Sequence, residues 1–172
     1  EVMADYAPLH VPARLADLEF RVQLHKDFRQ IDLPADNYDF ADPKVCCPLL
    51  VTMATYGAIV FGAAARPAYE NGTLKDWCEF FCEHNQFQVM AMGAGLIGDA
   101  QVILAEVTQQ TDAGPMRLRV GAMEDGGRLV LLSGMAPETV WPAMKEPLLH
   151  MIDSFRLERP QGRSVKLTPG GP

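Results

Sequence analysis

The chain has 172 residues, of which 48% are hydrophobic and 22% are charged, and it carries a formal net charge of -7. The length is typical of one domain, and the composition excludes a wholly disordered chain. The acidic balance disfavours nucleic acid as a partner, because binding to a phosphate backbone requires clustered lysine and arginine. No apolar run approaches the roughly 18 residues that a membrane span requires.

The first elements of the chain are predicted to be extended. Residues 1–17 form an N-terminal arm in this interpretation, and the arm either docks on the domain or stays mobile. Residues 18–24 alternate apolar and polar side chains, which is typical of a half-buried strand. A short turn leads to a second strand at 28–33, so the two strands are expected to form a hairpin.

After a loop rich in aspartate, asparagine and proline at 35–43, strands are predicted at 45–55 and 58–67. A helix is then predicted at 74–86, because apolar residues recur there at helical spacing. Thr73 and Asp76 have the spacing of a capping box at the start of this helix.

Three further strands are predicted at 100–108, 116–123 and 128–134. Their short connections require antiparallel neighbours. In the middle strand, Arg117 and Arg119 alternate with apolar residues, so we expect the arginine face to be exposed to water.

The last predicted element is an amphipathic helix at about 138–155, which Pro147 should kink or divide. Residues 158–172 are expected to form a flexible tail, which leaves 18–157 as the folded domain. These elements predict an α+β fold in which an antiparallel sheet of about six to seven strands is covered by two main helices.

The segment Gly93-Ala94-Gly95-Leu96-Ile97-Gly98 matches the spacing of a dinucleotide-binding fingerprint. That chemistry requires a helix that begins at the third glycine and holds the pyrophosphate at its N-terminus. The next residues are instead a β-type run, so we interpret the segment as a flexible or bulged connection and predict no cofactor.

The four cysteines, Cys46, Cys47, Cys78 and Cys82, allow three disulfide pairings and require none. We expect buried free thiols, which favours a cytoplasmic protein. The sequence leaves undecided whether the protein is exported, because it begins at Glu1 rather than Met. Cys78, Cys82 and His84 lie close together in sequence, but His84 lies nearly opposite Cys82 on a helix, so core thiols are favoured over a metal site or a nucleophile.

Other candidate groups give weaker signals. No spacing connects His10, His25 and His150 to a catalytic partner, and surface or capping roles are expected for them. The acidic loop with Asp36, Asp39 and Asp42 lacks the glycine and the terminal glutamate of an EF-hand and is interpreted as a solvated turn, so no metal is predicted.

Aromatic residues at helical spacing more often fill a core than line a ligand cleft. The alternative, a binding surface, would combine aromatic side chains with the basic face of the middle strand. Its candidate residues are Tyr69, Trp77, Phe80, Arg117, Arg119 and Trp141.

Taken in order, the elements resemble the PsbP-like fold. The resemblance covers roughly residues 18–157 and depends on Phe28–Pro34, the strand-to-helix passage Ala63–Trp77, the ladder Gln101–Leu132 and the closing Ile152–Arg156. This fold is shared by the photosystem II extrinsic subunit, a Ran-binding import factor of yeast, bacterial DcrB-like proteins and chaperones of type VI secretion effectors. The resemblance implies an α/β/α sandwich.

Members of this group are mostly non-enzymatic, so the resemblance implies an accessory domain that engages a protein partner, of the chaperone or assembly-factor type. The sequence leaves undecided whether the chain forms a homodimer. The alternative is a small-molecule carrier with an apolar pocket between helix 74–86 and the sheet. A third hypothesis is a thiol-dependent enzyme that uses Cys78 or Cys46.

Overall fold

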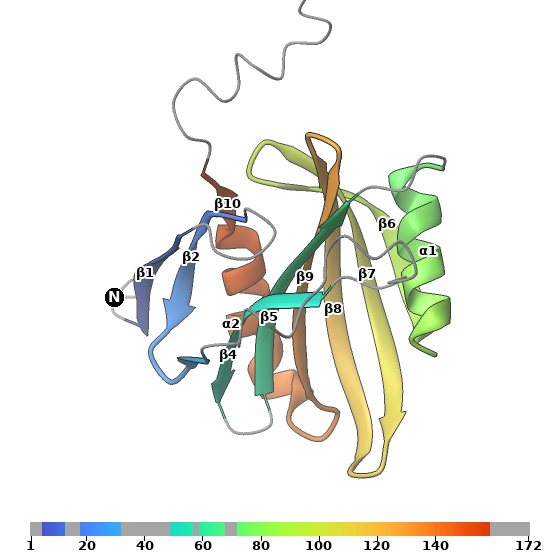
Figure 1. Ribbon diagram of the computed structural model, residues 1–172. Coiled ribbons are helices and arrows are strands. Elements are labelled where there is room, and N and C mark those ends of the chain that lie inside the picture. The colour runs from blue at the N-terminus through green and yellow to red at the C-terminus, as the bar shows by residue number, and fades with distance from the viewer. Residues whose placement is uncertain (1–4, 13–17, 32–48, 57–58, 68–71, 159–172) are drawn as a thin grey trace, which may run out of the picture.

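The computed structural model describes residues 5–12, 18–31, 49–56, 59–67 and 72–158 (Figure 1). Within these residues the strands form two antiparallel sheets. The large sheet has seven strands in the order β3-β4-β5-β9-β8-β7-β6, and the small sheet has three in the order β1-β2-β10. The strands are β1 Tyr6–Val11, β2 Phe20–His25, β3 Arg29–Ile31, β4 Leu49–Tyr56, β5 Ile59–Pro67, β6 Gln88–Ile97, β7 Ala100–Thr111, β8 Gly114–Asp125, β9 Arg128–Pro137 and β10 Arg156–Leu157.

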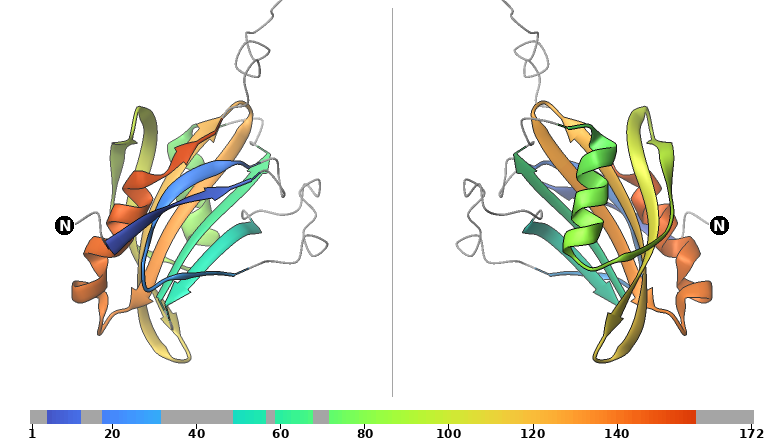
Figure 2. Two further views of the ribbon diagram at one scale, coloured as in Figure 1. Left: turned by 90° about the vertical axis from the view of Figure 1, so that its left-hand side faces the viewer. Right: turned by 90° about the vertical axis from the view of Figure 1, so that its right-hand side faces the viewer.

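The two helices cover opposite faces of the large sheet. Helix α1 (Leu74–His84) packs on one face, and helix α2 (Trp141–Ser154) packs on the other together with the small sheet (Figure 2). Each interface has its own cluster of buried apolar side chains. The structure is therefore of the α+β class, with a seven-stranded antiparallel sheet between two helices. It confirms the expected fold class and the layered sandwich.

Strand β8 contributes side chains to both faces of the large sheet. Its apolar positions, among them Leu118 and Val120, are buried in the cluster under α1. Arg117 and Arg119 alternate with them and so point to the α2 side, where both are half-buried. The expectation that this arginine face is exposed to water was wrong, because the second helix covers it.

The hairpin predicted from 18–24 and 28–33 is also wrong. Strand β2 pairs with β1 and β10, whereas β3 pairs with β4 in the large sheet. The turn itself is present, since the backbone N–H of Phe28 donates to the carbonyl of His25 at 2.9 Å. After this turn the chain moves from one sheet to the other.

Part of the predicted arm is a strand. Tyr6–Val11 pairs with β2 along its whole length, from Tyr6 opposite His25 to Val11 opposite Phe20. Among the described residues β1 is an edge of the small sheet. An edge strand tolerates Pro8 because the missing backbone N–H can face the side on which no strand pairs.

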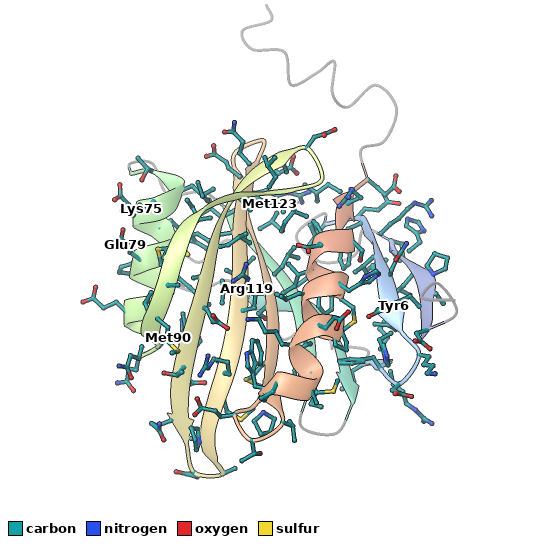
Figure 3. All side chains as sticks on the ribbon, turned by 180° about the vertical axis from the view of Figure 1, so that it is seen from behind. Tyr6, Lys75, Glu79, Met90, Arg119 and Met123 are labelled. Atoms are coloured by element: carbon teal, nitrogen blue, oxygen red, sulfur yellow. The ribbon has the colours of Figure 1, made fainter. Side chains whose placement is uncertain are left out.

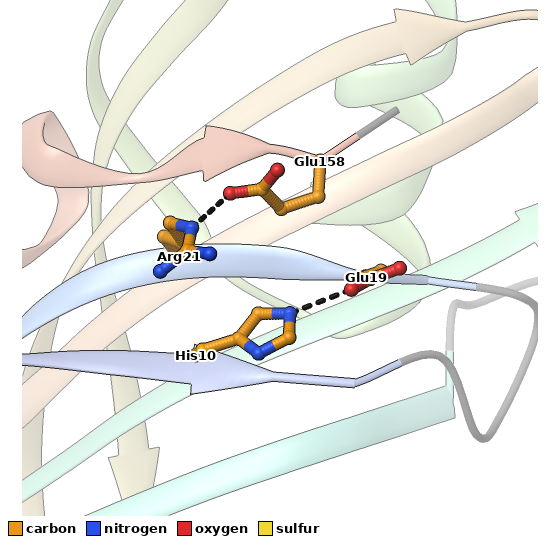
Figure 4. A network of polar contacts seen from close by, with 4 residues as sticks. All are labelled: His10, Glu19, Arg21 and Glu158. Carbon is orange, nitrogen blue, oxygen red and sulfur yellow. Dashed lines mark hydrogen bonds and ion pairs between the residues drawn. The ribbon is translucent and has the colours of Figure 1, made fainter. Parts of the chain in front are cut away.

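Polar contacts connect the three strands of the small sheet (Figure 4). The His10 ring contacts the Glu19 carboxylate at 2.6 Å, and Arg21 forms an ion pair with Glu158. The N–H of Glu158 also donates to the carbonyl of Glu19 at 2.9 Å. The expected tail beyond residue 158, like the loop at 35–43, lies outside the described residues.

Both helices begin and end close to their predicted bounds. The capping box of α1 is present: Thr73 Oγ1 accepts from the Asp76 N–H at 3.1 Å, and Asp76 Oδ2 accepts from the Thr73 N–H at 2.9 Å. Helix α1 ends at His84, and Gln86, with φ of 60°, turns the chain toward β6. Pro147 does not divide α2, which runs from Trp141 to Ser154.

Candidate interaction surface

The glycine motif lies in a strand and a tight turn. Strand β6 extends to Ile97, residues 98–99 form the turn, and β7 begins at Ala100. No helix follows the third glycine, so the arrangement that binds a pyrophosphate is absent from this part of the chain. The segment is not a flexible connection either: β6 pairs with β7 along its length, and its one irregularity lies between Val89 and Ala91.

Strand β6 is an edge of the large sheet, since it pairs with β7 on one side only within the described residues. Its sequence, QVMAMGAGLI, contains no charged residue and no proline. The opposite edge, β3, comprises three described residues and carries Arg29. Native proteins usually protect edge strands with charges, prolines, short length or β-bulges. Of these, β6 has only the irregularity between Val89 and Ala91.

The exposed apolar surface is concentrated on this strand. The described residues contain six exposed large hydrophobic side chains, and three of them are on β6: Val89 at 43%, Met90 at 54% and Leu96 at 63%. Figure 3 shows Met90 on the outermost strand. A Cβ atom on Gly93 would have no neighbour within 4 Å, so the middle of the edge is also open. A long apolar edge of this kind can form a ladder with an added strand.

A polar cluster lies on the α2 side of the sheet. Arg117 donates to Glu138 at 2.7 Å, and Glu106 receives longer ion pairs from Arg117 at 3.7 Å and from Lys145 at 3.8 Å. Arg119 is on the same face (Figure 3) and forms none of the ion pairs found among the described residues. The cluster connects α2 to β7 and β8.

Cys78 and Cys82 are buried free thiols, as expected, with exposed fractions of 0% and 1%. A hydrogen bond to Cys82, together with burial, raises the pKa of the Cys78 thiol far above its usual range. His84 is exposed and its ring lies 5.8 Å from that of Phe80, so it does not join the thiols. Among the described residues no group of three or more potential metal ligands occurs. Cys46 and Cys47, like Asp36, Asp39 and Asp42, lie outside the described part of the chain.

Two of the histidines, His25 and His150, lie against the ring of Tyr6. This arrangement was not predicted from the sequence. The Tyr6 ring stacks on His150 at 3.8 Å and contacts His25 edge-on at 5.3 Å. His150 Nε2 is 2.8 Å from the side-chain oxygen of Gln23. Burial, and secondarily the charge of Glu146, raises the pKa of Tyr6. These contacts attach β1 and β2 to α2.

The six residues of the predicted binding surface lie on two faces. Trp77 is buried between α1 and the sheet, and Phe80 is exposed on the same helix. Arg117, Arg119 and the buried Trp141 belong to the α2 side. Tyr69 lies outside the described residues. The structure therefore does not bring the five described residues together into one patch.

The inner side of α1 is filled by its own side chains. Trp77, Cys78, Phe81 and Cys82 are all at least nine-tenths buried against the sheet. A cleft of about 490 Å³ lies elsewhere, between the β6–β7 turn and β10. Its lining includes the buried Met123, with Asp99 and Arg156 among its polar groups.

Neither helix in the described residues has the length and apolar character to cross a membrane.

No protein-family model matches the sequence, and no curated protein shows significant sequence similarity to it. Solved structures do match its fold. The cyanobacterial PsbP protein CyanoP of Synechocystis sp. PCC 6803 is 10% identical with a TM-score of 0.62, and the match covers 90% of this chain and 94% of that chain.

Two further structures have the same arrangement. LpqN of Mycobacterium tuberculosis, described as involved in cell envelope biogenesis, is 8% identical with a TM-score of 0.61 over 92% of this chain and 95% of its own. A Pseudomonas aeruginosa protein of unknown function, PA94, is 12% identical with a TM-score of 0.53 over 88% of this chain and 98% of its own. At these identities the likeness is one of fold: the chain has the PsbP-like fold.

Proposed function

We propose that the protein is a non-enzymatic binding domain, of the chaperone or assembly-factor type, that engages a protein partner at the edge of β6. The observation that carries this proposal is the composition of the edge. A ten-residue strand without charge or proline presents Val89, Met90 and Leu96 to solvent.

Physical chemistry indicates how such an edge binds. The unpaired N–H and C=O groups of β6 are a template for a partner strand, and main-chain hydrogen bonds then supply affinity with little dependence on sequence. The exposed apolar side chains add burial of about 25 cal/mol for each Å² removed from water. A partner would therefore be an extended segment with large apolar side chains.

The thiol-enzyme hypothesis has less support. Cys78 is fully buried, and its raised pKa keeps it as a neutral thiol, whereas a nucleophilic cysteine needs thiolate character and access. A small-molecule carrier is the second candidate, although the predicted pocket between α1 and the sheet is filled by buried side chains. The 490 Å³ cleft beside Met123 and Arg156 favours a carrier instead, because its volume is within the range of ligand sites. Native mass spectrometry of freshly purified protein tests this alternative, and a clean apo mass would count against a retained ligand.

Site-specific photocrosslinking in the source cells tests the proposed function. A photoreactive amino acid at position 96 should capture a partner protein, whereas the same group at position 140 should not. Val140 is the matched control because it is also an exposed large hydrophobic residue and lies outside β6. Adding Met90→Lys to the position-96 protein should abolish capture. Equal capture at both positions, or capture that survives Met90→Lys, would count against the proposal.

A further inference from the structure

We infer that, in the absence of its partner, the edge of β6 is covered by β6 of a second copy of this chain, in an antiparallel pair centred on Gly93. This inference rests on the proposed function, because the same edge serves both interactions. It adds a resting state, a self-paired dimer that must open before the partner strand can bind.

The positions of the exposed side chains support a two-fold pair. Met90 and Leu96 lie three residues on either side of Gly93. In an antiparallel pair whose axis passes through residue 93, Leu96 of one copy lies opposite the irregular segment of the other copy that carries Val89 and Met90, and the reverse contact is identical. A two-fold interface must be self-complementary in this way. The three exposed apolar side chains of each strand therefore cover those of the other.

The centre of the strand favours close approach. Around the axis the opposed residues are Gly93 with Gly93, Met92 with Ala94, and Ala91 with Gly95. None of these pairs sets two large side chains against each other, and Gly93 has open space where a Cβ would lie. Pairing also creates no like-charge contact between the two copies of β6, because the strand carries no charged residue.

The net negative charge of the whole chain opposes dimerisation, but none of the charged residues lies on β6 itself. Each copy carries a net charge of -7, so the repulsion is long-range and is screened by salt. We therefore expect the dimer to become stronger as ionic strength rises. A contact made by ion pairs would show the opposite dependence.

The oligomeric state tests the inference directly. Light scattering coupled to size exclusion should show the full chain as a dimer whose fraction rises with protein concentration and with sodium chloride. Leu96→Lys should give a monomer with unchanged circular dichroism, because Leu96 is 63% exposed and its replacement leaves the core intact. Val140→Lys adds the same charge away from β6 and should remain a dimer. A wild-type monomer at all concentrations, or a dimer that weakens with salt, would overturn the inference.

Cysteine pairing tests the register. A residue on the axis of an antiparallel pair lies about 4.5–5.5 Å from its copy between Cα atoms, which a disulfide can bridge. Gly93→Cys should therefore form a covalent dimer under mild oxidation. Ala91→Cys should not, since two copies of residue 91 would be about 14 Å apart along the strands. Wild-type protein, which keeps the native cysteines, sets the background. Equal cross-linking of both variants, or none at residue 93, would contradict the register.

The two proposals fail separately. If the protein is a monomer but position 96 captures a partner, the resting dimer is wrong and the proposed function stands. If position 96 captures only a second copy in cells, the dimer stands and the proposed function is wrong.

Discussion

The guanidinium of Arg156 lies directly over Gly98, in the turn between β6 and β7. A Cβ atom on residue 98 would be 2.8 Å from Cζ and 2.8 Å from Nε of Arg156. Arg156 is held in this position because its Nη1 donates to the carbonyls of Asp153 at 2.7 Å and Phe155 at 2.6 Å. Gly98 also has φ of 59°, in the left-handed region. The left-handed backbone therefore favours glycine at this turn, and any Cβ atom there would also displace the Arg156 side chain.

Gly98→Ala should destabilise the protein. The left-handed backbone alone costs a residue with a Cβ roughly 1–2 kcal/mol, and displacement of Arg156 adds to this. Urea unfolding followed by circular dichroism measures the loss. Gly93→Ala is the matched control, since the new methyl group has no neighbour within 4 Å and φ is not positive there, so its stability should change little. Equal effects of the two substitutions would contradict this account.

The capping box makes α1 sensitive to acid. Hydrogen bonds from Thr73 hold the pKa of Asp76 below its usual value of 3.8. Because the folded-state pKa is lowered, the contribution of Asp76 is present above pH 3.8 and is lost as the pH falls through the folded-state pKa. Asp76→Asn should remove this part of the acid dependence in unfolding curves measured across a pH series. Thr73→Ala removes the hydroxyl acceptor and should cost about 1 kcal/mol at neutral pH.

Attachment of β1 to α2 should weaken at alkaline pH. Burial and the charge of Glu146 raise the pKa of Tyr6 above its usual value of 10.0. A raised folded-state pKa gives stability that is fully present below pH 10.0 and is lost as the pH rises through the folded-state pKa. Tyr6→Phe should retain the stacking on His150 and reduce the alkaline loss of stability. An unchanged alkaline slope in this variant would exclude Tyr6 as the cause.

The two thiols of α1 should be inert in the folded protein. Cys78 and Cys82 are almost fully buried, and the raised pKa of Cys78 disfavours its thiolate. Treatment with a maleimide at neutral pH, followed by peptide mapping, should leave both unmodified until a denaturant is added. Rapid modification of Cys78 without unfolding would revive the thiol-enzyme hypothesis.

Local signals in the sequence were sufficient for most elements. The Thr73 and Asp76 pair located the start of α1, and short links between β7, β8 and β9 required antiparallel neighbours. Long-range pairing was not accessible in this way. The turn after His25 has the appearance of a hairpin turn, yet it connects two different sheets. Only the tertiary contacts determine which strand β2 joins.

The candidate surface was missed for a related reason. Strand β6 has neither polar alternation nor charge, and its glycines resembled a cofactor motif. An edge strand is defined by the absence of a neighbour, which no local pattern encodes. The signal available in the sequence was the uninterrupted run without charge or proline from Gln88 to Ile97.

The small sheet joins strands from both ends of the described chain. Strand β10 completes it by pairing with β2, and Arg21 and Glu158, which are joined across that pair, are 137 positions apart in the chain. Contacts of such large sequence separation form slowly, since the intervening chain must first be closed into a loop. During synthesis on the ribosome, β1 and β2 therefore emerge long before β10, and the unpaired side of β2 is open to incorrect partners throughout that interval.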